Sequence, residues 1–235
     1  MRKVLFLAAI GLLSIGPSAL ADDWVMTITV DNQYDIYFGT DTTTTFYAGG
    51  DNNWFTVETW NAFGRAPTDY LYVATASDHG VAQGFLGHFV NVTSGQSIST
   101  GDQVWEVFPA GAYLQAIDPT WPNPWPFSLQ PTQAQVDAAI AYATANNLWI
   151  APSTLPGWTN ASHPGPWMHN MPGIPANAQW IWHDAGTAPP WLPYPAPFGG
   201  WNHDEFLIFR VPGIVPEPAA LLLLGLGTLL IRRRG

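Results

Sequence analysis

Two apolar segments flanked by basic residues lie at the extreme ends of this 235-residue chain and confine its globular part to the residues between them. At the N-terminus, Arg2 and Lys3 precede an apolar run over residues 4–15, and Ala19 and Ala21 supply small residues where a signal peptidase would cut. This order is typical of a secretory signal peptide. A run of this length is too short to cross a bilayer, so we expect removal of residues 1–21 rather than permanent anchoring. Signal peptidase and the general secretion machinery are therefore the first expected partners.

A second short apolar segment closes the chain. Residues 219–231 are apolar or small, two prolines just before them interrupt any helix that enters from the domain, and three arginines follow. A helix of this length extends about 20 Å, less than the ~30 Å hydrocarbon core, so it would be a marginal membrane span. The arginines should stay in the cytoplasm, which places the domain outside the inner membrane. An ordinary tail anchor or a buried C-terminal helix is the alternative.

The motif Pro216-Glu217-Pro218, the apolar segment and the basic tail Arg232-Arg233-Arg234 together resemble the PEP-CTERM sorting domain. The resemblance covers residues 215–235. It implies recognition by an exosortase, an integral-membrane enzyme that would cut near the Pro-Glu-Pro motif. It also implies transient anchoring in the inner membrane, followed by delivery to the cell surface or the extracellular matrix of hosts that typically make exopolysaccharide.

The charge of the intervening segment, residues 22–214, limits its partners. The segment has sixteen acidic residues, no lysine and only two arginines, Arg65 and Arg210, which gives a net charge of −14 with histidine neutral. Nucleic-acid binding requires basic side chains that neutralise phosphates, so we exclude it, and anionic lipids are disfavoured for the same reason. The chain also lacks cysteine, which excludes disulfides and thiolate chemistry.

Short alternating segments separated by turn residues predict a mainly β domain. One inserted helix is expected after Thr132, because this residue and Gln135 form a capping-box pattern ahead of an apolar stripe. Asn146 and Asn147 should end the helix, and long Pro- and Trp-rich loops surround it at residues 117–129, 152–177 and 188–200. The whole predicts an antiparallel β-sandwich with strands at residues 24–30, 34–39, 44–48, 55–60, 70–76, 84–91, 102–108, 178–183 and 205–211.

Several local motifs are similar to those of galactose-binding-like jelly-roll domains. They are the hairpin at residues 30–39, Asn53-Trp54, the Ala-Thr-Ala sequence at 74–76, the glycine-flanked 84–87 and the Ala-Gln-Trp-Ile-Trp sequence at 178–182. The inserted helix and the Pro/Trp-rich loops are not part of this pattern. The resemblance implies a jelly-roll sandwich whose ligand sits on loops at one end.

Tryptophan is abundant in this domain, and its rigid ring suits the C–H face of a sugar, although most of the thirteen tryptophans should belong to the core or fill loops. The candidate carbohydrate-binding residues are Asp51, Asn53, Trp54, Trp60, Trp158, Trp167, Trp191 and Trp201.

The sequence offers candidate ligands for two kinds of metal site. Ca²⁺ is the candidate cofactor, because it prefers oxygen ligands and Asp31, Asp35 and Asp41 lie close together in the sequence of the first hairpin. Asp and Asn are also the usual turn residues, which is the alternative explanation. A transition-metal site would need His183, His203 and the Asp78-His79 pair to converge, and no HExxH pattern supports this.

Catalytic patterns are weak. Glu58, Glu106 and Glu205 are the glutamates that could serve a glycosidase, but nothing in the sequence pairs them, and no Gly-x-Ser-x-Gly elbow is present. We therefore expect a non-catalytic exported sandwich that associates with exopolysaccharide. A self-associating matrix protein without a small ligand is the main alternative, and a hydrolase is a third.

Overall fold

The computed structural model describes residues 21–76, 82–121, 130–162, 170–184, 197–198 and 206–213. Residues 1–20 of the expected signal peptide, the Pro216-Glu217-Pro218 motif, the apolar segment after it and the basic tail Arg232-Arg233-Arg234 lie outside these residues, so they remain predictions. Within the described ranges, no helix combines the length and apolar character that crossing a membrane requires.

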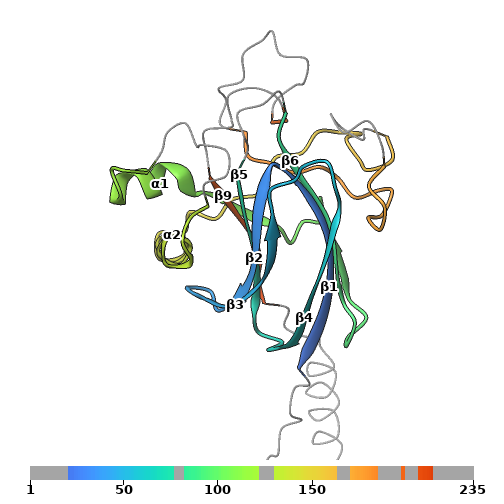
Figure 1. Ribbon diagram of the computed structural model, residues 1–235, viewed down its shortest axis with the longest axis horizontal. Helices are drawn as coiled ribbons and strands as arrows, with labels where there is room; N and C mark the ends of the chain where they lie inside the picture. Colours follow the sequence, from blue (N-terminus) through green and yellow to red (C-terminus); the bar gives the residue numbers. More distant parts are fainter. Residues whose placement is uncertain are drawn as a thin grey trace, which may run out of the picture.

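The described chain is mainly β, as predicted, and forms two antiparallel sheets. Sheet A has the strand order β4-β1-β6-β7, and sheet B has the order β3-β2-β5-β9-β8. Figure 1 shows the sheets as two facing layers. The strands are β1 (Asp22–Asp31), β2 (Gln33–Gly39), β3 (Thr44–Asp51), β4 (Glu58–Arg65), β5 (Tyr70–Ala76), β6 (Gly84–Asn91), β7 (Ser97–Ser99), β8 (Glu106–Pro109) and β9 (Leu207–Val211).

The main core lies between the two sheets. Alternation along β1 turns every second side chain inward, because successive residues of a strand point to opposite faces. Contacts between aromatic rings then join the layers: Trp24 of β1 meets Phe38 of β2 (5.9 Å between ring centroids), and Phe85 of β6 meets Phe209 of β9 (5.2 Å). Burial of these large apolar surfaces is the principal stabilising term of the sandwich.

A second core lies on the outer face of sheet B, under α1 (Ala110–Ile117) and α2 (Gln133–Ala145). Figure 1 shows both helices on that side of the sheet. The predicted capping box is confirmed: the Thr132 hydroxyl accepts from the Gln135 backbone N–H, and the Gln135 side chain accepts from the Thr132 backbone N–H. The apolar stripe of α2 is buried against the sheet, so the helix is part of the fold rather than an appended segment.

Two observed elements, helix α1 and strand β7, were not predicted, and three predicted strands were wrong in part. The strand predicted at residues 55–60 begins only at Glu58, since residues 54–56 form a turn. Residues 102–105 form a turn rather than the start of a strand, because the Asp102 carboxylate accepts the Ser99 backbone N–H and reverses the chain. Residues 178–183 form isolated bridges, such as Phe85 with Ile181, instead of a continuous strand.

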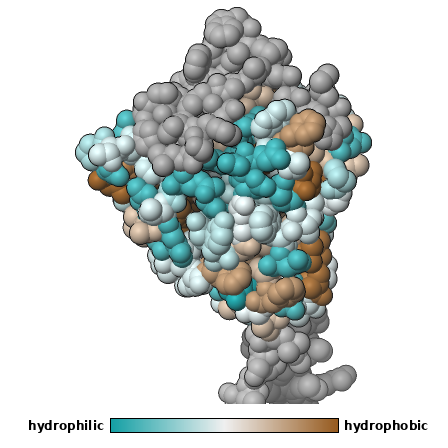
Figure 2. Space-filling view, in the orientation of Figure 1, coloured by the Kyte–Doolittle hydropathy of each residue, from teal (hydrophilic) through white to brown (hydrophobic). Residues whose placement is uncertain are grey.

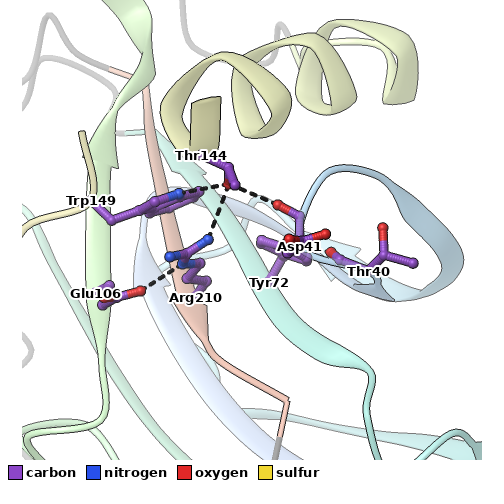
Figure 3. A network of polar contacts seen from close by, with 7 residues as sticks. All are labelled: Thr40, Asp41, Tyr72, Glu106, Thr144, Trp149 and Arg210. Carbon is purple, nitrogen blue, oxygen red and sulfur yellow. Dashed lines mark hydrogen bonds and ion pairs between the residues drawn. The ribbon is translucent and has the colours of Figure 1, made fainter. Parts of the chain in front are cut away.

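A buried arginine attaches α2 to sheet B (Figure 3). The Arg210 Nε donates to Glu106 Oε2 (2.6 Å), and its Nη1 donates to the Thr144 hydroxyl (3.2 Å). Its guanidinium carbon lies 3.9 Å from the centroid of the Trp149 ring, and the Thr144 hydroxyl donates to the Asp41 carbonyl (2.7 Å). Guanidinium is suited to this position because it can donate in a plane and stack on an aromatic face at once. The network therefore joins the end of α2, strands β8 and β9, and the β2–β3 turn.

Candidate functional site

The loop between β3 and β4, residues 52–57, presents two aromatic side chains to solvent, Trp54 and Phe55. Its backbone is held by short polar contacts. The Asp51 carboxylate accepts the backbone N–H groups of Asn52 (2.6 Å) and Asn53 (3.1 Å), and the Asn53 side chain accepts the N–H of Phe55 (3.2 Å). The two rings meet edge to face, with 5.5 Å between their centroids. The loop therefore displays a defined aromatic surface beside carboxylate and amide groups.

A chain of hydrogen bonds joins this loop to the sandwich. The Trp60 indole N–H donates to the Tyr34 hydroxyl (2.9 Å), which donates to Glu58 Oε2 (3.1 Å). The Thr56 hydroxyl of the loop donates to the other Glu58 oxygen. The Trp60 ring itself lies against Gly49, where an added Cβ would stand only 2.2 Å from the ring. Glycine is thus required at that position for the ring to pack on the strand.

Burial alters the acidity of this cluster. It raises the pKa of Tyr34 well above its usual range, so the hydroxyl stays protonated and serves as a donor. Burial also raises the pKa of Glu58; the hydrogen bonds from Thr56 and Tyr34 oppose the shift, and the negative charge of Asp51 adds to it. The Tyr34 hydroxyl therefore remains the donor of the hydrogen bond that holds Glu58.

The predicted carbohydrate-binding residues divide into three groups. Asp51, Asn53, Trp54 and Trp60 do come together around the β3–β4 loop, although the Trp60 ring is half-buried and packs on the core. Trp158 lies elsewhere, half-buried and stacked on Phe198 (5.0 Å between centroids). Those outside the described residues are Trp167, Trp191 and Trp201.

Sequence reasoning missed the contributions of Phe55 and Tyr34 to this site. It named Glu58 only as a possible catalytic carboxylate. Tyr34 and Glu58 are 24 residues apart, and the pairing of β2 with β3 and of β1 with β4 is what makes them neighbours. Only the exposed aromatic pair after the Gly-Gly-Asp-Asn turn offered a local signal in the sequence.

The structure does not bring the three proposed calcium ligands together. Asp31 ends β1 and pairs with Gly84, Asp35 lies within β2 opposite Gly50, and Asp41 occupies the exposed β2–β3 turn. They are separated because β1 and β2 belong to different sheets and the turn lies at the far end of β2. Throughout the described ranges, no three His, Cys, Asp or Glu side chains form a group that could hold a metal ion. Of the histidines proposed as ligands, His183 is described, whereas His79 and His203 are not.

The structure also separates the candidate catalytic glutamates. Glu58 lies on β4, an edge of sheet A that neighbours β3, whereas Glu106 lies on β8 at the opposite edge of the sandwich. Glu106 is engaged by Arg210. Glu205 is outside the described residues. Glu58 and Glu106 therefore cannot act as the two carboxylates of one glycosidase site, which require a separation of roughly 5–10 Å.

The site thus belongs to an antiparallel two-sheet protein with an exposed aromatic loop at one edge. A scan against protein-family models found no match, and searches of the curated proteins and of the solved structures found none either.

Proposed function

We propose that this chain is an exported, non-catalytic protein of the bacterial envelope or extracellular matrix that associates with a neutral exopolysaccharide. The observation that carries the proposal is the exposed Trp54–Phe55 pair beside the carboxylate and amide groups of the β3–β4 loop. In this proposal the two sheets are those of a galactose-binding-like jelly roll, with glycan held by a loop at the edge of the sandwich.

The chemistry of the loop suits a sugar. Trp54 is 36% exposed and Phe55 59%, so each offers part of an apolar ring to the C–H face of a pyranose. Asp51 and Asn53 stand beside the rings as hydrogen-bonding groups for hydroxyls. Precisely placed polar groups beside an apolar surface are the usual composition of a small-ligand site.

The charge of the domain favours a neutral polymer. Its only two basic side chains are already engaged, since Arg65 lies over the Phe46 ring (3.7 Å) and Arg210 is bound to Glu106. An anionic polysaccharide would meet an acidic surface without a compensating cation. We therefore place uncharged glycans first among the expected ligands.

The test compares retention of the chain on immobilised neutral polysaccharides with and without the aromatic pair. The Trp54→Ala and Phe55→Ala variants should each bind about tenfold more weakly, which corresponds to roughly 1.4 kcal/mol per lost stacking contact. Phe63→Ala is the matched control, because Phe63 is 64% exposed on β4 but lies outside the loop. Equal binding by all four proteins, or no retention of the unmodified chain on any neutral glycan, would refute the proposal.

Export and sorting form the second part of the proposal. Residues 1–21 would be removed during secretion, and an exosortase would act near Pro216-Glu217-Pro218 after the C-terminal segment enters the inner membrane. Localising the chain in cells tests this: Pro216→Ala with Glu217→Ala should retain the protein in the membrane fraction. Recovery of the unprocessed chain from the cytosol would contradict both export signals.

Self-association is a second candidate function, and the helix layer on sheet B favours it. Tyr113 of α1 stacks on Tyr142 of α2 (4.1 Å between ring centroids). Two exposed apolar residues, Ile117 and Leu148, lie a few residues further along the chain from these tyrosines. Figure 2 shows apolar surface at the exposed end of this layer, as well as apolar patches elsewhere on the same face. Light scattering over a range of concentrations tests it, and a chain that stays monomeric throughout would count against it.

A further inference from the structure

A hollow lies far from the β3–β4 loop, at the opposite edge of the sandwich. It has a volume of about 480 Å³ and is bounded by the turn after β7, by residues 151–154 and by Ile181. In sheet A, β7 and β4 form opposite edges, so this pocket and the aromatic loop do not share residues. A volume of this size falls within the range of small-ligand pockets, about 300–1,000 Å³.

Hydrogen bonds within the fold hold the walls of this pocket. The Ser99 backbone N–H donates to one Asp102 carboxylate oxygen (2.8 Å), and the Trp105 indole N–H donates to the Ser99 carbonyl (2.9 Å). On the other wall, Ser153 and Trp182 exchange two backbone hydrogen bonds (2.8 and 3.1 Å). The pocket is therefore formed before any ligand arrives, which lowers the entropic cost of binding.

The turn at the pocket floor requires glycine. Gly101 has φ +93°, a conformation that side-chain-bearing residues rarely adopt, and a Cβ there would stand 2.6 Å from the Gln179 side chain. This close approach brings residues 101–105 against the segment that carries Ile181. Three stretches distant in the sequence thus converge on one hollow.

The lining combines unused polar groups with an apolar wall. Within the described chain, the second Asp102 oxygen, the Gln103 amide and the Thr154 hydroxyl make no hydrogen bond to another residue. Ala151 and Pro152 supply accessible apolar surface, and among the described residues no basic side chain lines the pocket. A carboxylate, an amide and a hydroxyl can together accept from and donate to neighbouring hydroxyl groups. This composition fits a neutral sugar ring, with its hydroxyl rim and its apolar C–H face.

We propose that this pocket binds one or two rings of a neutral saccharide and is a second attachment point for the polymer that the β3–β4 loop contacts. The inference rests on the proposed function and adds a separate site on the opposite edge. Two contacts on one polymer raise the apparent affinity because the second contact forms within the complex.

The experiment titrates the purified chain with maltose, cellobiose and lactose, using saturation-transfer NMR and isothermal titration calorimetry. Thr154→Trp should fill the pocket and abolish binding, and Gln103→Ala should weaken it about tenfold. The matched controls are Thr42→Trp and Gln96→Ala, which change exposed turn residues outside the pocket. Phe63→Ala, which changes an exposed residue of β4 outside both proposed sites, should leave disaccharide binding unchanged.

The outcomes separate the two proposals. Loss of disaccharide binding in Thr154→Trp, with binding retained in Thr42→Trp, supports the pocket. If the unmodified chain is retained on a neutral polysaccharide while no disaccharide binds, or while Thr154→Trp binds as well as the unmodified chain, the pocket proposal is overturned and the glycan-associated function stands. If neither polymer nor disaccharide binds, both are overturned.

Discussion

Asp35 is a buried carboxyl group whose ionisation should oppose folding. Asp35 lies within β2 and is only 4% exposed. Burial raises the pKa of its carboxyl group to about 6 from an ordinary value of 3.8. The Tyr47 hydroxyl donates to it (3.1 Å), which offsets part of that shift. Replacement by asparagine keeps the shape and an acceptor oxygen but removes the charge.

The pKa difference sets the expected magnitude. Below pH 3.8 both the folded and the unfolded chain hold the proton on Asp35, so burial of this group costs nothing through ionisation. Between pH 3.8 and about 6 only the unfolded chain ionises, and the free energy of unfolding falls as the pH rises. A pKa difference of about two, at roughly 1.4 kcal/mol per unit, gives about 3 kcal/mol, which remains lost above pH 6.

Urea unfolding measures the free energy that ionisation of Asp35 costs. The native chain and Asp35→Asn are compared from pH 4 to pH 8 in the presence of a chelator. The stability of the variant relative to the native chain should increase by most of that 3 kcal/mol over this range. The other titrating groups are common to both proteins and cancel in the comparison. A stability difference that stays constant with pH, or that moves in favour of the native chain at high pH, would refute the reasoning.

Three further predictions concern stability, each measured by urea unfolding. Arg210→Ala should lower the free energy of unfolding by about 2–3 kcal/mol, because it removes an ion pair and a stacking contact at once, and a lysine at this position should restore less than half of the loss. Gly49→Ala should cost about 1–3 kcal/mol more than Gly64→Ala, because both positions have a positive φ (+154° and +69°) that strains alanine, whereas only at Gly49 does a Cβ also meet the Trp60 ring. Thr132→Ala should cost about 1 kcal/mol through loss of the α2 cap; an unchanged midpoint would contradict that role.

Elements with a strong local signal were predicted well. The strands beginning near Tyr34, Tyr70 and Gly84 lie where alternation and turn residues placed them, and the α2 cap formed as its capping-box pattern indicated. Where the outcome depended on a partner, the prediction was wrong. Residues 102–108 were predicted as one strand, yet the Asp102 carboxylate accepts the Ser99 backbone N–H, the chain turns, and β8 begins only at Glu106. A local hydrogen bond of this kind competes with strand pairing, and the sequence does not show which of the two wins.

The amino-acid sequence by itself determined the mainly β character, the acidic and lysine-free composition of residues 22–214 and the absence of cysteine. These follow from composition and from patterns within a few residues. Only the tertiary structure decided that Trp54 is exposed while Trp105 is buried, that Glu106 is bound by an arginine 104 residues away, and that a pocket forms beside Asp102. Both sheets pair strands distant in the chain, so the neighbours of a side chain exist only after the sandwich closes.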